Sequence, residues 1–342
     1  MNSPKTDKDK SSSKPGRLGW LAGRESLPFL AATAILFIAF SLAEPRFLNA
    51  YNLLNILRNS SYLIIISLGQ MLALVVGGFD LAVGAVVALS SITSALAMVY
   101  LKSVFPGQVV LIISLALLAA LAAGTAVGLA NGLCVAWLKV PPFIVTLGTM
   151  SVTNGIVLYL TNGIPIYGMP EEFIIWFGRA RWLGLPIPIY VMLVVLIGMY
   201  WLMNWTLSGR YMYAIGGNPH AARVSGIRVN IHTATAYVIC AVLSAVTGVL
   251  LTARVGSGEG TMGGELIMQS IAAAVIGGVS IGGGVGRVEL VAVGAIFLTL
   301  VTNGMNLAQV DSKLQTIVVG VILMIAVAFD QFRRRRQEDY RP

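Results

Sequence analysis

The chain is poor in the residue types that carry catalytic chemistry. Its 342 residues include only 2 histidines and 2 cysteines, and only 11% are charged. Neither an H-x-x-x-H nor a C-x-x-C spacing occurs, so the sequence predicts no metal-ligand cluster, no reactive nucleophile and no cofactor. Soluble domains contain about 25% charged residues, whereas 57% of this chain is hydrophobic and its mean hydropathy is +0.83. These shortages argue against catalysis and predict an all-α polytopic membrane protein.

Nucleotide-binding motifs and intramembrane acids are also scarce. The glycines between 277 and 286 could be mistaken for a phosphate-binding loop, but the chain has no G-K-[ST] sequence to supply the lysine. Proton- or sodium-coupled transporters usually carry acids or histidines inside their spans, and here Asp80 is nearly alone in such a position. A secondary transporter or channel that works alone is therefore the less favoured alternative. A membrane-embedded enzyme would lack any reactive cluster.

Long apolar runs dominate the rest of the chain. Ten of them are predicted membrane spans, since a span needs about 17 to 25 residues. They cover residues 27–43, 62–77, 79–100, 109–137, 143–162, 187–204, 232–253, 264–281, 287–307 and 313–329. The first could instead be a cleaved secretory signal, but its apolar core is long for a signal and a membrane anchor is favoured. An even number of spans places both ends of the chain on one side.

The basic residues indicate which side that is. The formal net charge is +9 and 23 residues are Lys or Arg, but they lie at the two ends and in short loops, which fits membrane orientation better than nucleic-acid binding. Most fall on one side if the N-terminus is cytoplasmic, as the positive-inside rule requires. We therefore predict a disordered cytoplasmic tail over 1–24, a transmembrane domain over 25–331 with a cytoplasmic loop at 205–231, and a basic cytoplasmic tail over 332–342. The glycine-rich boundaries near 77 and 282 are where a missed or extra span would change this map.

The loop at 205–231 separates two long apolar runs and must lie in water. Its middle is predicted to be a short helix, because Asn218 is a good N-cap, Pro219 suits the first helical turn and Gly226 would end the helix. Any polytopic protein needs basic cytoplasmic loops with turns, so this segment alone leaves the function open.

Polar residues inside the spans are candidates for a translocation path. Asp80 is the acid most enclosed by apolar sequence, and a carboxylate at the centre of a membrane helix costs about 2.5 to 3.5 kcal/mol. A carboxylate that caps the following helix would cost much less, so capping and a functional polar site both remain open for it. For the others, hydrogen bonding between helices is the alternative role. The candidates are Asp80, Gln70, Asn154, Gln269, Asn303 and Asn306.

Glycine and proline positions predict how helices pack and break. Gly124, Gly128 and Gly132 are spaced four apart, so one helix face lets a neighbouring backbone approach closely, and Asn131 beside them could hydrogen-bond across that contact. Pro141-Pro142 predicts a break before the fifth span. The stretches VVGGFDLAVG and VIGGVSIGGG recur 200 residues apart, a weak indication of internal duplication.

Residues 163–186 form the longest predicted outer segment. Glu171 and Glu172 follow Pro170 and begin an amphipathic piece whose aromatic residues suit the membrane interface. A helix lying in the interface is favoured, and a docking surface for an external partner is the alternative.

Four stretches resemble, in order, motifs of the permeases of the ribose/xylose/arabinose class of bacterial sugar ABC importers. They are VGGFDLAVG at 76–84, LKVPPFIVTLGTM at 138–150, GGNPHAARVSGI at 216–227 and AVIGGVSIGGGVG at 274–286. The third also resembles the E-A-A-x-x-x-G signature of ABC importer permeases, with His220 in place of glutamate.

This resemblance implies a translocation subunit in the bacterial inner membrane that imports a monosaccharide, ribose by default, by ATP-driven alternating access. It implies three protein partners: ABC ATP-binding subunits that hydrolyse the ATP, a periplasmic sugar-binding protein and a second permease subunit in a homodimer. The permease itself would also contact membrane lipid, and no nucleic acid. The family's ATPase-coupling loop carries over to Gly217, Asn218, Ala221, Ala222, Ser225, Gly226 and Ile227. Selectivity in this class rests largely with the binding protein, so the sugar stays open.

Overall fold

The structure is a computed structural model that describes residues 27–338; the tail predicted over 1–24 lies outside this range. Within it the chain is almost entirely helical, which confirms the predicted all-α class. The elements in chain order are α1 (Leu27–Ala43), α2 (Ala50–Val75), α3 (Val83–Val104), α4 (Val109–Ala136), α5 (Pro142–Thr161), α6 (Glu171–Phe173), the π-helix η1 (Ile174–Arg179), β1 (Arg181–Trp182), β2 (Leu185–Pro186), α7 (Ile187–Trp205), α8 (Leu207–Gly217), α9 (Pro219–Val224), α10 (Val229–Val255), α11 (Gly264–Ile276), α12 (Val288–Leu307) and α13 (Ser312–Glu338).

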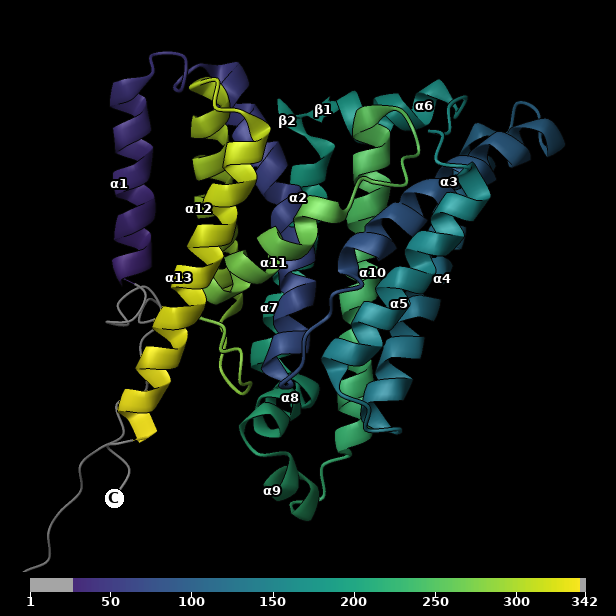
Figure 1. Cartoon of the computed structure of the whole chain (residues 1–342). Coiled ribbons are helices and arrows are strands. Elements are labelled where there is room, and N and C mark those ends of the chain that lie inside the picture. The colour runs from purple at the N-terminus through teal and green to yellow at the C-terminus, as the bar shows by residue number, and fades with distance from the viewer. Residues whose placement is uncertain (1–26, 339–342) are drawn as a thin grey trace, which may run out of the picture.

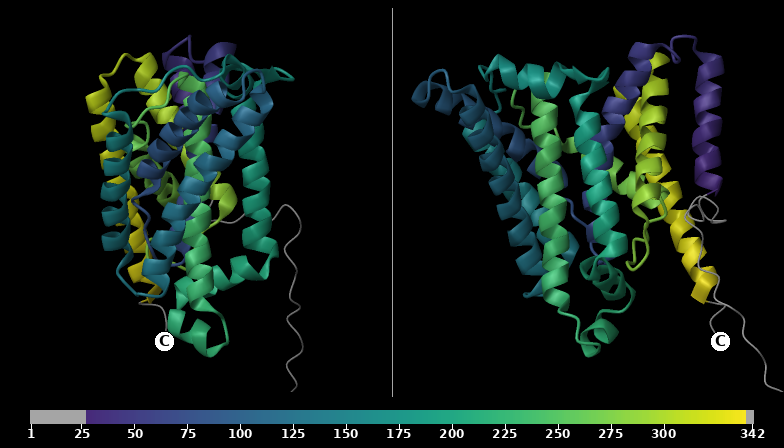
Figure 2. Two further views of the ribbon diagram at one scale, coloured as in Figure 1. Left: turned by 90° about the vertical axis from the view of Figure 1, so that its right-hand side faces the viewer. Right: turned by 180° about the vertical axis from the view of Figure 1, so that it is seen from behind.

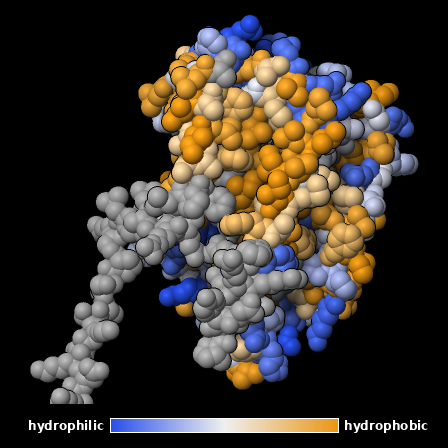
Figure 3. All heavy atoms as spheres, turned by 60° about the vertical axis from the view of Figure 1, so that its left-hand side comes forward, coloured by the Kyte–Doolittle hydropathy of each residue, from blue (hydrophilic) through white to orange (hydrophobic). Residues whose placement is uncertain are grey.

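The long helices form one bundle with two distinct ends. Figure 1 and the rear view in Figure 2 show α8 and α9 at one end, and α6 with the β1–β2 hairpin at the other. The chain rises along α1 toward the hairpin end, and the last turns of α13 lie toward the α9 end. The face drawn in Figure 3 carries a broad apolar band across its middle, with hydrophilic residues toward both ends.

Seven described helices are long and apolar enough to cross a membrane: α3, α4, α5, α7, α10, α12 and the segment Ser312–Gln331 of α13. The 13 residues of α11 are a shorter apolar helix, about 20 Å long against a hydrocarbon core of about 30 Å. A polytopic bundle is thereby confirmed, with fewer long apolar helices among the described residues than the ten spans predicted. Most predicted ends differ from the observed ones by a few residues, whereas α13 continues well beyond 329.

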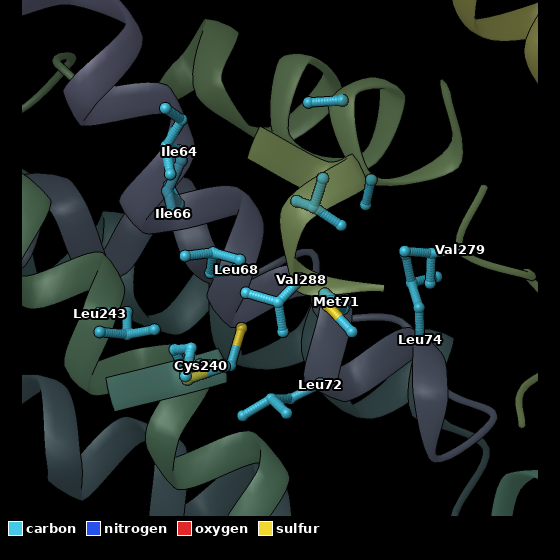
Figure 4. Close-up of a cluster of buried hydrophobic side chains, with 14 of the residues drawn as sticks. Ile64, Ile66, Leu68, Met71, Leu72, Leu74, Cys240, Leu243, Val279 and Val288 are labelled. Carbon is cyan, nitrogen blue, oxygen red and sulfur yellow. The ribbon is translucent and has the colours of Figure 1, made fainter. Parts of the chain in front are cut away.

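Helix α2 forms the centre of the bundle. Every residue from Ser60 to Val75 is buried, and α2 packs against α7, α10, α11 and α12. Figure 4 shows part of the apolar core around it, with Leu74 beside Val279 and Met71 beside Val288. A helix that is buried on all sides is typical of one surrounded by protein rather than lipid.

The start of α2 corrects a prediction. The apolar run predicts a span from 62, whereas the helix begins at Ala50. Its polar first turns find partners inside the bundle, since Asn52 and Asn303 of α12 exchange side-chain hydrogen bonds at 2.9 and 3.1 Å. Hydropathy alone cannot separate such a paired polar turn from a loop.

Helices α2 and α11 end in the same way. The backbone φ is 84° at Gly77 and 79° at Gly278. In each case the amide of this glycine donates to the carbonyl three residues earlier, and the amide of the following residue donates to the carbonyl five residues before it. The separation of Gly77 and Gly278 is one residue greater than the 200-residue offset between the similar stretches VVGGFDLAVG and VIGGVSIGGG. Because this cap ends α11 at Ile276, the predicted apolar run 264–281 is not one helix.

The predicted close contact of the glycine face is confirmed between α4 and α10. A Cβ added to Gly124 or Gly128 would lie 2.7 Å from an alanine Cβ of α10, and one added to Gly132 would lie 2.9 Å from an alanine Cα. The Nδ2 of Asn131 donates to Oδ1 of Asp80 at 3.4 Å, so its partner lies in the turn between α2 and α3 and not on α10.

The longest predicted outer segment folds against the end of α10. Phe173 is buried, while Ile175 and Trp176 are 46% and 44% exposed, so this helical piece is amphipathic as predicted. The hairpin that follows turns through Leu183 and Gly184, with φ of 48° and 83°. Two consecutive positive φ values are the geometry of the tight turns that connect adjacent strands.

Candidate functional site

Helix α9 stands out from the bundle at the end opposite the hairpin (Figure 1). Its N-cap is Asn218, whose Oδ1 accepts hydrogen bonds from the backbone amides of His220 and Ala221, both at 3.0 Å. Pro219 occupies the first turn, and Gly226 follows the helix with φ of 82°. The predicted short helix is confirmed, because these residues supply a side-chain acceptor, a fixed φ and a left-handed residue.

One side chain anchors α9 and the rest of its surface is open. Ala222 is 4% exposed and belongs to the main apolar core, whereas Val224 is 77% exposed. Ile227 is half-buried against the same core. The other residues expected to contact an ATPase are exposed: Gly217, Asn218, Ala221, Ser225 and Gly226. We call these exposed residues the α9 surface.

The α9 surface lies in a basic setting. Arg210, Arg223 and Arg228 are all exposed, and residues 205–231 contain no Asp or Glu. Acidic side chains on a partner would therefore be attracted to this end of the bundle.

Helix α8, which precedes α9, was missing from the sequence-based prediction. The Oγ1 of Thr206 caps it by accepting from the Gly209 amide at 3.2 Å. A Cβ on Gly209 would lie 2.6 Å from Cα of Met203, so glycine lets α8 fold back on the end of α7. This glycine and the pair Gly216-Gly217 resemble helix breakers in sequence, which concealed the helix.

Tyr213 fixes α8 to the loop between α11 and α12. Its hydroxyl donates to the backbone carbonyl of Gly286 at 2.8 Å. Burial and then the Glu289 carboxylate raise the pKa of Tyr213 to about 12, against a smaller opposite effect of Arg287, so the hydroxyl remains a donor at neutral pH. No local sequence signal indicates this contact, because its partners are 73 residues apart.

Asp80 organises the turn that leads into α3. It is 1% exposed, and its Oδ1 accepts from the Ala82 amide at 2.9 Å, directly before the helix begins at Val83. It lies on neither of the two cavities described below. The N-cap residue of α3 is Ala82, which makes no side-chain cap bond, so Asp80 orders the turn before the helix without occupying its N-cap position.

A polar cavity of about 430 Å³ lies between α11, α12 and α13. Two candidate path residues line it, Gln269 of α11 and Asn306 of α12, together with Glu265 and Thr302. The Gln315 amide, also in the lining, donates to Asn306 Oδ1 at 2.8 Å. These groups offer donors and acceptors to a polar solute. The second cavity, about 540 Å³ between α1, α11, α12 and α13, is lined mostly by apolar residues.

The remaining path candidates lie elsewhere. Asn303 is paired with Asn52. Gln70 is fully buried in α2, and neither of its side-chain polar atoms has a hydrogen-bond partner among the described residues. Asn154 is half-buried on α5, away from both cavities. The structure thus groups Gln269 with Asn306 and separates them from the others.

The family model described as branched-chain amino acid transport system / permease component matches residues 52–327. The chain belongs to this permease family. It is 36% identical over 314 residues to the ribose import permease protein RbsC of Escherichia coli (strain K12), covering 91% of this chain and 94% of that one. It is 37% identical over 305 residues to the protein of the same name in Bacillus subtilis (strain 168), with 89% and 92% covered.

A third relative is the D-allose transport system permease protein AlsC of Escherichia coli (strain K12), 35% identical over 303 residues, with 89% and 90% covered. No solved structure matches this chain. The family assignment and the seven apolar helices make this permease a multi-pass inner-membrane protein. The family match over 52–327 includes α8, α9 and the lining of the polar cavity.

Proposed function

We propose that this permease is the translocation subunit of an ATP-driven ABC importer that moves a monosaccharide, ribose or a close relative, into the cytoplasm. The observation that carries the proposal is α9, a capped, exposed helix in a basic setting that is held clear of the bundle yet anchored to its core. The sugar class rests on relatives that are named for ribose and allose and align over about nine-tenths of the chain.

In this proposal the α9 surface docks on an ABC ATP-binding subunit. Closure of two such subunits on ATP would push α9, and α8 would carry the push into the bundle. ATP hydrolysis belongs to those partners, and this permease supplies the moving path. Alternation between outward-open and inward-open forms then follows from the rocking of helices around the path.

The proposed topology has ten membrane passes, with both termini and α9 in the cytoplasm. It draws on the predominance of basic residues at the α9 end and on the hairpin lying at the opposite end. A periplasmic sugar-binding protein would dock at the hairpin end. A second copy of the permease would complete the path, and lipid would cover the remaining apolar surface.

We assign the polar cavity to the translocation path. Gln269, Asn306 and Thr302 present amides and a hydroxyl, which match the hydroxyl groups of a sugar without the tight charge pairing that would slow its release. Gln70, Asn154 and Asn303 are weaker candidates, because none of them borders this cavity. Replacing Gln269 by Leu should lower uptake more than replacing Asn154 by Leu.

Reconstitution tests the proposed function directly. Proteoliposomes would contain either the permease alone or the permease with its ATPase, with the sugar-binding protein added, and uptake of radiolabelled ribose and other monosaccharides would be measured. We expect uptake only in the presence of ATPase, ATP and binding protein. Uptake by the permease alone would instead establish a stand-alone transporter.

Gly226 provides a residue-level test of the coupling role. Its φ of 82° is unfavourable for a β-branched residue, although an added Cβ would meet nothing within 4 Å. Gly226→Val should therefore abolish ATP-driven uptake by displacing the end of α9, while membrane insertion stays normal. Gly226→Asn is the matched control, because asparagine tolerates this conformation; equal uptake by both variants would contradict the role.

A further inference from the structure

Three glycine-rich segments that are far apart in sequence contact one another where α8 ends, directly before α9. They are the end of α2 at 75–78, the end of α8 at 216–217 and the loop 277–287 between α11 and α12. Of these three segments, the proposed function uses only α8. The contacts among all three suggest how a push on α9 reaches the helices that border the path.

The loop is bonded directly to the last turn of α2. The amide of Gly284 donates to the carbonyl of Val75 at 2.9 Å. A Cβ on Gly286 would lie 3.2 Å from Cγ2 of Val75 and 3.3 Å from Cε of Met71. In Figure 4, Val279 of the same loop lies beside Leu74 of α2. The loop therefore holds the end of α2 through both its backbone and its side chains.

Gly216 of α8 lies against that hydrogen bond. A Cβ on Gly216 would overlap both the Val75 carbonyl oxygen and the Gly284 amide nitrogen. From the other side, a Cβ on Gly283 would lie 2.9 Å from the Gly216 carbonyl oxygen and 3.0 Å from Cα of Gly77. Backbone meets backbone here, with no side chain between the segments to change rotamer and absorb a displacement.

The same contact reaches the polar cavity. Helix α11 lines the cavity with Gln269 and continues into the loop at Gly277. The loop continues into α12, which lines the cavity with Asn306. The Tyr213 hydroxyl, bonded to Gly286 at 2.8 Å, keeps α8 seated on the loop. A displacement of α9 and α8 is thus applied to α11 and α12, two of the three helices that border the cavity.

We propose that the contact of Gly216 with Val75 and Gly284 is the joint that transmits the movement of α9 to α2, α11 and α12. This inference rests on the proposed function. Gly216 is a positioning residue, which binds neither ATP nor sugar and acts through the backbones that it touches. Its lack of a Cβ is what allows the three segments to move as one.

A glycine outside the α9 surface provides a matched control. Gly198 is in α7, the helix before α8, and an added Cβ there would meet nothing within 4 Å. The experiment compares Gly216→Ala, Gly198→Ala and the wild type as complete complexes in proteoliposomes, at equal complex content. The measured quantity is ribose transported per ATP hydrolysed, which a merely structural loss of folded protein would leave unchanged.

We expect Gly198→Ala to keep the wild-type ratio and Gly216→Ala to lower it at least tenfold while ATP hydrolysis continues. A wild-type ratio in Gly216→Ala would overturn the joint and leave the proposed function intact. If the wild-type complex itself shows no ATP-dependent uptake, both proposals are overturned.

A second variant tests the proposed joint if Gly216→Ala yields no folded complex. Tyr213→Phe removes only the hydroxyl that seats α8 on the loop. Spin labels on Val224→Cys of α9 and Met268→Cys of α11, both exposed side chains, would report whether the two helices move together on ATP binding. We expect the distance change to shrink and the ribose-to-ATP ratio to fall in Tyr213→Phe. Wild-type values for both quantities would overturn the joint.

Discussion

Asn218 illustrates how strongly a short helix depends on one side chain. α9 has 6 residues, and isolated helices of this length are unstable in water. The Asn218 side chain binds two of the amides that a first turn leaves unpaired. Tertiary contact adds little, since Ala222 is the buried residue of α9. The cap therefore determines how often the α9 surface is formed.

Asn218→Ala should lower the helicity of α9 and with it the affinity for the ATPase. Loss of such a cap costs about 1 kcal/mol, which corresponds to a roughly fivefold weaker complex. Titration of the purified ATPase onto detergent-solubilised permease would measure this. Asn218→Ser keeps a capping oxygen and should retain most of the affinity; an equal loss in both variants would show that the cap is not the cause.

Asp80 can be tested in the same residue-by-residue way. Its Oδ1 accepts from the Ala82 amide, and Asp80→Asn preserves a side-chain oxygen at this position, whereas Asp80→Ala leaves a buried amide unpaired at a cost of about 1 to 3 kcal/mol. We expect a lower thermal unfolding temperature for Asp80→Ala and nearly normal uptake for Asp80→Asn. Loss of uptake in a stable Asp80→Asn variant would restore a direct role in the path.

Local chemistry explains which site residues could be predicted from sequence. Asn218, Pro219 and Gly226 act on their own backbone, so their residue types reveal the helix they delimit. Gln70 and Gln269 look alike in sequence, because each is an amide inside an apolar run. One faces the centre of the bundle and the other a cavity, and only the packing of neighbouring helices decides between these outcomes.

At the scale of elements, the α4–α10 contact was predictable because small residues repeat along one face. Gly128→Leu should force this contact apart, since a Cβ there would already lie 2.7 Å from that of Ala241. Overpacking of this kind costs about 1 to 3 kcal/mol, so thermal unfolding in detergent should shift downward. Gly148→Leu on α5, where an added Cβ meets nothing within 4 Å, is the control and should unfold at the wild-type temperature.

Elements whose polar residues are satisfied by distant partners were harder to predict. The first turns of α2 look like a loop in sequence because Asn52 finds its partner on α12. α8 was missed because its glycines serve close contacts with α7 and α2 rather than turns. α11 was predicted too long because an apolar run continues past a C-cap that is made by backbone geometry alone. For α2 and α8, tertiary contacts override local preference, whereas for α11 the decisive feature is a local backbone cap that hydropathy does not register.

At the scale of the whole molecule, the four conspicuous sequence motifs gather around the end of α2. Gly77 and Gly78 belong to the first, and a Cβ on Gly78 would lie 3.3 Å from Cγ of Pro142 in the second. Gly216 and Gly283, from the third and fourth, meet at Gly77. Their order along the chain carries no information about this convergence. Residues of all four motifs therefore form one structural unit next to α9.

The two ends of the bundle provide a prediction for the molecule as a whole. Leu183 in the hairpin is 83% exposed and Val224 on α9 is 77% exposed, and they lie at opposite ends. With Cys134 and Cys240 replaced by alanine, a membrane-impermeant maleimide should label Leu183→Cys in intact spheroplasts and Val224→Cys only in inside-out vesicles. The paired sites control for each other, because both are loop-proximal and similarly accessible. Labelling of Val224→Cys from the periplasm would place α9 beyond the reach of any cytoplasmic ATPase and would overturn the proposed function together with the joint at Gly216.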